Sequence, residues 1–293
     1  MKAAIYSRVM EDDQRENVQV FFDELAHRKI SPVVFEHFHE QIRGSIRLPE
    51  DTTTFSLSEH ISGQIECFVS LGGDGTLLDA IALVRDKNIP IMGINFGRLG
   101  FLASIGQDEI GMAVQAIARR TFVIDKRTMI HLDADLPLFG NVPYALNEFS
   151  IHKRDTASMI KIHTYLNGEF LNTYWADGLI VATPTGSTGY SLSCGGPVVF
   201  PESGSFVITP VAPHNLNMRP IIVPDDNVIS FEVESRHDNI ICALDARREM
   251  VGKSVSLAVR KESFSVSLVR LSGHSFLQTL QNKLTWGLDK RNY

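Results

Sequence analysis

The periodicity of the apolar residues changes near residue 125, and this change constrains the fold more than any other feature of the sequence. Before it, short apolar runs such as 65–71 alternate with segments of helical spacing such as 14–29. Parallel strands need long crossovers, usually helices, so this part predicts a parallel sheet with helices packed on it. After it, apolar and polar residues alternate with period two in the runs 159–166, 227–235, 254–260 and 263–271. This alternation predicts mostly antiparallel β structure. The expected fold class is therefore α/β plus β.

A chain of 293 residues is long enough for two domains. We expect an α/β domain over residues 1–125 and a mostly antiparallel β domain over residues 126–271. Residues 272–293 have helical spacing and are expected to pack back onto the first domain. Asn167-Gly168 is a preferred two-residue hairpin turn, so the strands on either side of it should pair. The polar stretch 45–59 predicts a surface loop.

Charge and composition argue against two classes of partner. The formal net charge is -6 and no long run of Lys or Arg is present, so nucleic acid is not an expected partner. No apolar run approaches the roughly 18 residues that a membrane helix needs, and the first residues turn acidic before a signal-peptide core could form. We therefore expect a cytoplasmic protein without a membrane partner. Cys67, Cys194 and Cys242 form neither a CxxC pair nor a zinc spacing.

Three glycines surround one carboxylate at Gly72-Gly73-Asp74-Gly75, between an apolar run and a helix expected from Thr76. A Gly-rich turn between strand and helix exposes backbone N–H groups, and the helix adds its positive end, so the segment can bind phosphate. It matches neither a Walker loop nor a GxGxxG fingerprint. Asp74 would repel phosphates unless it bound a metal or took a proton. Taken alone, the segment leaves two interpretations open: a helix cap, or a base in a phosphate cradle.

A second turn-rich segment covers residues 177–197. Its hydroxyl groups belong to Thr183, Thr185, Ser187, Thr188, Tyr190, Ser191 and Ser193. So many small polar groups offer donors and acceptors to a polar ligand, although the segment alone is equally consistent with a loop.

With these segments in view, the sequence resembles the NAD kinase family over nearly the whole chain. The resemblance lies in LGGDGT at 71–76, GRLGFL at 97–102, LNEFSI at 146–151, the segment 177–197, and ITPVAPHNLNMRPIIVP at 208–224. The glycine cluster alone is weak evidence, because diacylglycerol kinases, sphingosine kinases and phosphofructokinases have similar segments. The resemblance implies a Rossmann-like N-terminal domain, a β-sandwich C-terminal domain and a dinucleotide bound between them.

The implied reaction transfers the γ-phosphoryl group of ATP to the 2'-hydroxyl of the adenosine ribose of NAD, giving NADP. It requires a divalent metal ion, expected to be Mg²⁺, whose protein ligands are not assigned. Asp74 is then the general base, and the donor phosphates lie on Gly72, Gly73, Gly75 and Thr76. The NAD-binding residues implied by the resemblance are Asp74, Gly75, Phe101, Asn147, Glu148, Asp177, Thr185, Thr188, Gly189, Tyr190, Ser193 and Arg247. The family usually forms homodimers or homotetramers.

Chemistry suits several of these implied roles. The Asn147 amide can donate to and accept from an adenine edge, and the Glu148 carboxylate can accept from two ribose hydroxyls. Asp177 resembles the residue that meets the nicotinamide carboxamide. Phe101 either packs against the adenine or is a core residue.

Three departures from the family pattern bear on the site. Ala246 replaces a glycine beside Asp245, Gly189 stands where alanine is frequent, and Asp79 stands where many relatives carry a basic or neutral residue. The last departure leaves the donor-phosphate contacts open. Two alternatives also remain: a lipid kinase of the same superfamily, and a dinucleotide sensor without turnover.

Overall fold

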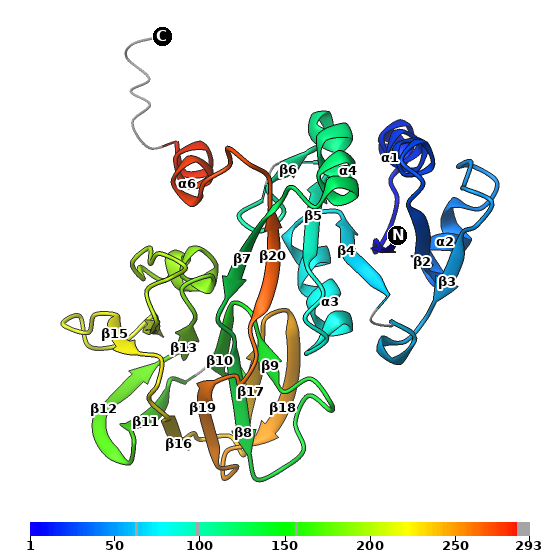
Figure 1. Cartoon of the computed structure of the whole chain (residues 1–293). Helices are drawn as coiled ribbons and strands as arrows, with labels where there is room; N and C mark the ends of the chain where they lie inside the picture. Colours follow the sequence, from blue (N-terminus) through cyan, green and yellow to red (C-terminus); the bar gives the residue numbers. More distant parts are fainter. Residues whose placement is uncertain (62–63, 98–99, 156–157, 286–293) are drawn as a thin grey trace. The chain divides into compact units, whose positions relative to one another are not determined.

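The computed structural model of the chain describes residues 1–61, 64–97, 100–155 and 158–285. The chain divides into two compact units, coloured along the sequence in Figure 1. Unit 1 comprises Met1–Lys126 and Val266–Tyr293, and unit 2 comprises Arg127–Ser265.

Unit 1 is built on an eight-stranded sheet. Its strand order is β3 (Thr53–Phe55), β2 (Ser31–Phe35), β1 (Lys2–Tyr6), β4 (Ile65–Leu71), β5 (Ile91–Asn95), β20 (Val266–Arg270) and β7 (Val123–Arg127), with β6 (Ile105–Gly106) paired to β5. The six pairs from β3 to β20 and from β5 to β6 are parallel, as the periodicity predicted. The helices are α1 (Arg15–His27), α2 (Glu36–Ile42), α3 (Asp74–Val84), α4 (Ile110–Arg119) and α6 (Phe276–Leu284). Short 3-10 turns cover Asp12–Gln14, Ser58–His60 and Gln107–Glu109.

The core of unit 1 forms where amphipathic helices cover the sheet. In α1, Val18, Phe21, Phe22 and Leu25 are buried and recur every three or four residues, so they share one helix face. Each of these fully buried side chains contributes about 1.5–3 kcal/mol through removal from water. Helix α4 lies beside α1 (Figure 1) and buries its own apolar face in the same core.

Two sequence predictions differ from this sheet. The stretch 45–59, expected to be a loop, contains the edge strand β3, which extends the sheet by pairing with β2. The run 263–271, expected in the β domain, contains β20, which pairs in parallel with β5 of unit 1. Unit 2 accordingly ends at residue 265 and not at residue 271. Period-two alternation indicates a strand but does not identify its partner, which explains the second difference.

Unit 2 consists of two six-stranded antiparallel sheets. One sheet has the order β15 (Ile221–Pro224), β14 (Ser205–Val211), β13 (Gly178–Ala182), β10 (Glu148–Lys153), β17 (Asn239–Leu244) and β18 (Arg247–Gly252). The other has the order β12 (Glu169–Ala176), β11 (Ile160–Leu166), β16 (Ile229–Glu234), β19 (Leu257–Lys261), β8 (Ile130–Ala134) and β9 (Tyr144–Ala145). A 3-10 turn (Gly186–Thr188) and the short helix α5 (Tyr190–Ser193) follow β13.

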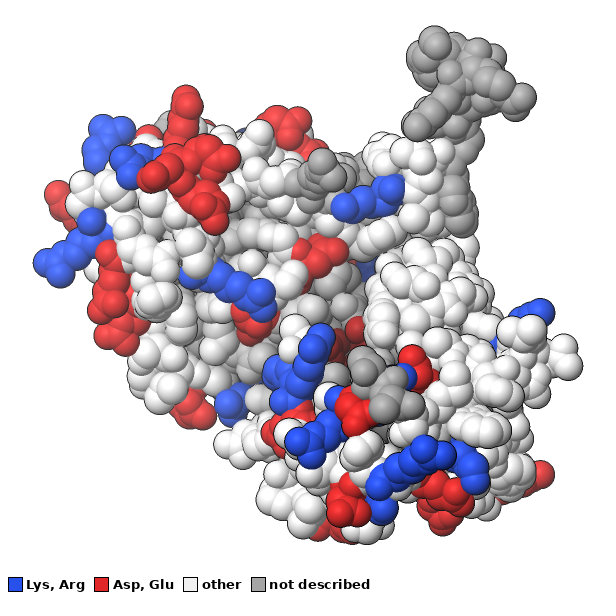
Figure 2. All heavy atoms as spheres, turned by 180° about the vertical axis from the view of Figure 1, so that it is seen from behind, with Lys and Arg blue, Asp and Glu red and all other residues white. Residues whose placement is uncertain are grey.

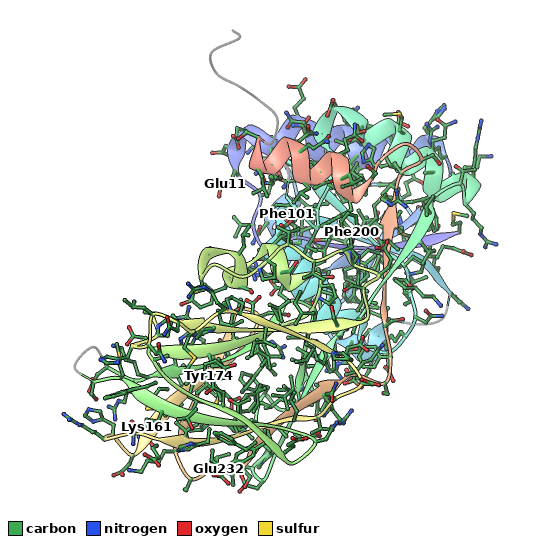
Figure 3. The ribbon with its side chains drawn as sticks, turned by 90° about the vertical axis from the view of Figure 1, so that its left-hand side faces the viewer. Glu11, Phe101, Lys161, Tyr174, Phe200 and Glu232 are labelled. Atoms are coloured by element: carbon green, nitrogen blue, oxygen red, sulfur yellow. The ribbon has the colours of Figure 1, made fainter. Side chains whose placement is uncertain are left out.

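The two sheets of unit 2 share one core, as in a β-sandwich. Phe149 of the first sheet and Phe231 of the second have ring centroids 5.8 Å apart. Tyr174 is fully buried among the side chains of this core (Figure 3). Asn167 and Gly168 have φ values of +50° and +83°, so the hairpin between β11 and β12 turns where the sequence predicted.

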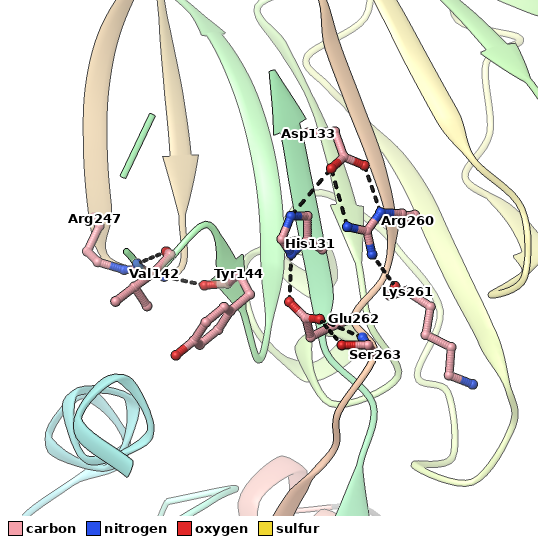
Figure 4. A network of polar contacts seen from close by, with 9 residues as sticks. All are labelled: His131, Asp133, Val142, Tyr144, Arg247, Arg260, Lys261, Glu262 and Ser263. Atoms are coloured by element: carbon pink, nitrogen blue, oxygen red, sulfur yellow. Dashed lines mark hydrogen bonds and ion pairs between the residues drawn. The ribbon is translucent and has the colours of Figure 1, made fainter. Parts of the chain in front are cut away.

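On the face of the molecule drawn in Figure 2, charged side chains are not segregated by sign. On the face drawn in Figure 2, acidic and basic residues are interspersed over the described part of the chain. Figure 4 shows one cluster within unit 2, where His131 lies between the carboxylates of Glu262 and Asp133 and Arg260 also binds Asp133. These contacts join β8 to β19 and the residue that follows it, in the second sheet of unit 2.

Candidate active site

The turn between β4 and α3 in unit 1 requires glycine at position 72 and leaves little space for a side chain at position 75. Gly72 has φ +145°, and a Cβ there would lie 2.5 Å from Oγ1 of Thr76. Gly75 faces the guanidinium of Arg8, because a Cβ on Gly75 would lie 3.1 Å from the Arg8 Nη1. Helix α3 begins at Asp74, two residues earlier than expected, with Gly73 as its N-cap. The backbone N–H groups of its first turn therefore belong to the glycine cluster itself.

The Asp74 side chain is held by the GRLGFL segment and does not cap α3. Its Oδ2 accepts the backbone N–H of Phe101 at 2.9 Å, and its Oδ1 accepts those of Leu102 at 3.1 Å and Ala103 at 2.9 Å. A Cβ on Gly100 would lie 1.8 Å from Oδ1, so this approach requires glycine. A carboxylate has about four acceptor positions, and Oδ2 keeps one of them. The helix-cap interpretation is therefore wrong.

Phe101 is half-buried, and the Nζ of Lys283 on α6 lies 5.9 Å from its ring centroid (Figure 3). This partial burial fits either an adenine contact or a peripheral core residue. Arg98 and Leu99 of the same segment lie outside the described residues.

Asp79, the departure in α3, is neutralised within unit 1. Its carboxylate accepts hydrogen bonds from Nε and Nη2 of Arg8, the latter at 2.8 Å, and from the Tyr6 hydroxyl at 2.9 Å. Burial, followed by the charge of Asp79, raises the pKa of Tyr6. The phenol therefore remains a hydrogen-bond donor to Asp79.

Unit 2 contains a separate cavity of about 400 Å³ at the first sheet. It is lined by Glu148, Ser150, His152, Tyr190, Ile241, Ala243, Asp245 and Arg248. The structure thus brings Glu148 of LNEFSI and Tyr190 of the segment 177–197 into one cavity. The Tyr190 ring lies 5.7 Å from the imidazole of His152.

Asp245 fixes the backbone of the LNEFSI segment. Its carboxylate accepts the N–H groups of Leu146 at 3.0 Å, Asn147 at 2.7 Å and Glu148 at 3.3 Å. Asp245 has φ +53° and is the left-handed residue of the β17–β18 turn, whereas Ala246 has no positive φ. Alanine in place of the family's glycine is therefore compatible with this turn.

The Glu148 carboxyl is in an unusual electrostatic environment. Burial, followed by the charge of Asp245, raises the pKa of Glu148 to about 8. Its Oε2 is buried and has no hydrogen-bond partner among the described residues. Burial also raises the pKa of Asp245, against the effect of its three N–H donors. The carboxyl of Glu148 thus retains its proton at neutral pH and can still accept a ligand hydroxyl.

The segment 177–197 is bound to LNEFSI by its glycines and by some of its hydroxyls. A Cβ on Gly186 would lie 2.0 Å from the carbonyl oxygen of Asn147. A Cβ on Gly189 would lie 3.3 Å from Oε2 of Glu148, so the alanine of many relatives would fit only with a small shift. Thr183 donates to the carbonyl of Leu146 at 2.5 Å.

Only part of the hydroxyl-rich segment is accessible to a ligand. Tyr190 and Ser193 are exposed, and Thr188 is half-buried. The fully buried hydroxyls are those of Thr183, Ser187 and Ser191, and they bond within the unit. The expectation that the whole segment offers groups to a ligand is wrong for these three, because their hydroxyls are buried and form hydrogen bonds within the protein.

The remaining predicted residues of unit 2 already have protein partners. The buried Thr185 hydroxyl accepts from Nη1 of Arg127 at 3.2 Å, and Asp177 forms an ion pair with Lys153 at 2.6 Å. The Arg247 guanidinium donates to the carbonyls of Val142 and Tyr144 (Figure 4) and lies 5.8 Å from the ring centroid of Phe139. Arg248, which sequence reasoning did not select, lines the cavity that Arg247 does not line.

The sequence signals that could have identified these contacts are weak. Arg248 follows Arg247 directly, but alternation along β18 places adjacent side chains on opposite faces of the sheet. Gly100, next to Phe101 in GRLGFL, is the position whose missing side chain admits the Asp74 carboxylate.

The turn, the cavity and their two-unit fold define a class of nucleotide-dependent kinases, and comparisons with known proteins identify the family. The model of the ATP-NAD kinase N-terminal domain matches residues 6–122, and that of the C-terminal domain matches residues 146–271. The chain is 47% identical over 290 residues to an NAD kinase of Cytophaga hutchinsonii, covering 99% of each chain, and 40% identical to one of Flavobacterium johnsoniae, covering 100% of each. The chain therefore belongs to the NAD kinase family.

Two solved structures have the same fold. Yeast NADH kinase complexed with NADH has a TM-score of 0.88 at 22% identity, covering 100% of this chain and 89% of that chain. An NAD kinase from Archaeoglobus fulgidus in complex with ATP has a TM-score of 0.76 at 23% identity, covering 97% and 99%. None of the helices in the described part of the chain is long and apolar enough to cross a bilayer.

Proposed function

We propose that this chain phosphorylates the 2'-hydroxyl of the adenosine ribose of NAD with ATP and releases NADP. The observation that carries the proposal is the Asp74 carboxylate, held by three backbone N–H groups beside a glycine turn at the start of a helix. The turn suits the phosphates of the donor, because exposed N–H groups and a helix N-terminus favour anions. The predicted donor-phosphate residues are Gly72, Gly73, Gly75 and Thr76. The N–H groups of Gly72 and Thr76 already donate to the carbonyls of Ile94 and Gly73, so the proposal relies on the N–H groups of Gly73 and Gly75.

In the proposed step, the ribose 2'-oxygen attacks the γ-phosphorus of ATP. An oxygen–phosphorus bond forms to the ribose, the bond from the γ-phosphorus to the β,γ-bridging oxygen breaks, and ADP leaves. Asp74 receives the hydroxyl proton through the acceptor position that Oδ2 retains. Positioning and charge neutralisation supply most of the rate in phosphoryl transfer, so the fixed orientation of this carboxylate is the main contribution of the loop.

Most of the predicted NAD contacts belong to unit 2, and Gly75 and Phe101 belong to unit 1. Glu148 accepts from ribose hydroxyls and Asn147 pairs with the adenine edge. The other predicted NAD contacts are Gly75, Phe101, Asp177, Thr185, Thr188, Gly189, Tyr190 and Ser193. The role predicted for Arg247 is better filled by Arg248, because the Arg247 guanidinium is bound to backbone carbonyls while Arg248 lines the cavity.

The described residues contain no group of three or more His, Cys, Asp or Glu side chains arranged to hold a metal ion. Mg²⁺ in kinase sites is usually bound by one or two carboxylates together with substrate phosphates. No protein ligand is assigned to the ion, which would neutralise charge on the donor phosphates when bound. The divalent metal ion, the homodimeric or homotetrameric assembly and the cytoplasmic location remain predictions.

The test is NADP formation from NAD, ATP and Mg²⁺ by the wild-type protein and by Asp74→Asn. The variant should bind NAD yet lose at least about 100-fold in rate, since a general base contributes that much or more. Asp86→Asn is the matched control, because Asp86 is an exposed carboxylate just past the same helix. NAD binding without any NADP formation by the wild type would favour the dinucleotide sensor, and failure to bind NAD would favour a kinase with another acceptor.

A further inference from the structure

Arg8, just past β1, has a guanidinium whose three nitrogens are divided between two neighbours. Nε and Nη2 bind the Asp79 carboxylate in α3. Nη1 is the nitrogen nearest to Gly75, at 3.1 Å from the point that a Cβ of Gly75 would occupy, and Nη2 lies 3.8 Å from the same point. The fork of the guanidinium is thus anchored at one edge, and its other edge lies over the glycine turn.

We infer that Arg8 binds the phosphates of the donor nucleotide and that Asp79 is a positioning residue that holds it there; this rests on the proposed function. The donor brings several negative charges to a turn that already carries the Asp74 carboxylate, with Asp79 in the following turn of the helix. The helix N-terminus supplies only about half a unit of positive charge against them. Arg8 neutralises Asp79 and still presents N–H donors of Nη1 toward the turn.

The immediate surroundings keep this guanidinium in one orientation. Asp79 binds it through two nitrogens, which fixes the plane of the fork. The Tyr6 hydroxyl donates to the same carboxylate, and the carbonyl of Arg8 accepts from the Gln41 side chain at 3.2 Å. Gly75 completes the arrangement, because a Cβ there would lie only 3.1 Å from Nη1 and the guanidinium would have to shift.

This arrangement also accounts for the departure at position 79. An acidic residue near a phosphate site is unfavourable unless a cation satisfies it. Here the Asp79 carboxylate and the Arg8 guanidinium form an ion pair, and Nη1 of Arg8 faces Gly75. Arg8, just past β1, supplies the positive charge that binds phosphate, and Asp79 in α3 fixes the orientation of the guanidinium.

The experiment measures the Kd of ATP with Mg²⁺ by calorimetry, without NAD, and the KM values of ATP and NAD, for wild type, Arg8→Gln and Arg8→Lys. Arg8→Gln should weaken ATP binding and raise the KM of ATP by about tenfold, as expected for loss of a partly exposed charged hydrogen bond. The KM of NAD should stay within about twofold. Arg8→Lys should recover part of the loss, since it restores the charge without the fork.

Arg120→Gln is the matched control, because Arg120 forms an exposed ion pair with Glu66 in the same unit. It should leave the Kd of ATP unchanged. If Arg8 only stabilised the fold, Arg8→Gln would lower the unfolding temperature and leave the Kd of ATP at the wild-type value, which would overturn the inference. A wild type that binds no ATP would overturn it as well. A wild type that binds ATP through Arg8 but makes no NADP would contradict only the proposed function.

Discussion

Replacing Glu148 by glutamine should stabilise the nucleotide-free protein, and the gain should increase with pH. Burial and the charge of Asp245 raise the pKa of Glu148 from 4.5 to about 8 in the folded protein. The folded state therefore binds this proton more tightly than the unfolded chain does. Below the unfolded pKa both states are protonated and the group costs nothing, whereas stability falls as pH rises from there toward the folded pKa.

The magnitude follows from the size of the shift. One pKa unit corresponds to about 1.4 kcal/mol, so the raised pKa of Glu148 lowers the unfolding free energy by about 2 kcal/mol at pH 6 and about 4 kcal/mol at pH 8. Glutamine has nearly the same shape and does not ionise. The variant should therefore gain about 2 kcal/mol relative to wild type between these two pH values.

Urea unfolding of both proteins, followed by circular dichroism at each pH, measures this difference. Glu169→Gln is the control, because Glu169 is an exposed glutamate on β12 of the same unit. A stability difference between Glu148→Gln and wild type that stayed constant from pH 6 to pH 8 would refute the reasoning.

Three further outcomes are expected. Gly100→Ala should reduce NADP formation at least about 100-fold in steady-state assays, because its Cβ must displace the Asp74 carboxylate. Gly111→Ala on α4 is the control and should leave the rate unchanged, because a Cβ there would meet only a side-chain atom of Glu24 at 4.0 Å. Asp245→Ala should lower the unfolding free energy by about 2–4 kcal/mol in urea titrations, since three backbone N–H groups lose their acceptor. The affinity for NAD, measured by calorimetry, should rise with pH up to about 8 if the ribose hydroxyls bind the ionised form of Glu148, and a pH-independent affinity would argue against that contact.

Local patterns predicted the parts of this fold that depend on neighbours in sequence. The β11–β12 hairpin turns at Asn167-Gly168 because both residues adopt positive φ. The helix α1 follows from apolar spacing alone. The edge strand β3 was missed because it is only three residues long, two of them exposed threonines, and its pairing with β2 comes from the tertiary fold.

The site depends on contacts that no local pattern contains. The donors to Asp74 lie 27 to 29 residues further along the chain, and those to Asp245 lie 97 to 99 residues before it. The resemblance to a family identified both segments but not the bonds between them. Burial likewise separated Thr183 and Ser187 from the accessible hydroxyls of the same segment, although their residue types are the same.

The position of β20 has a consequence for how the chain acquires its structure during synthesis. β20 lies between β5 and β7 in the unit 1 sheet, yet it is made after all of unit 2. Unit 2 is one continuous segment, so it can fold as soon as residue 265 has left the ribosome. Until residues 266–270 emerge, β5 and β7 have no strand between them, and the part of the β5 edge that β6 does not pair with stays open to other chains. The unit that starts first is therefore completed last, and a ribosome that stalls after residue 265 leaves a finished β-sandwich joined to an unfinished sheet.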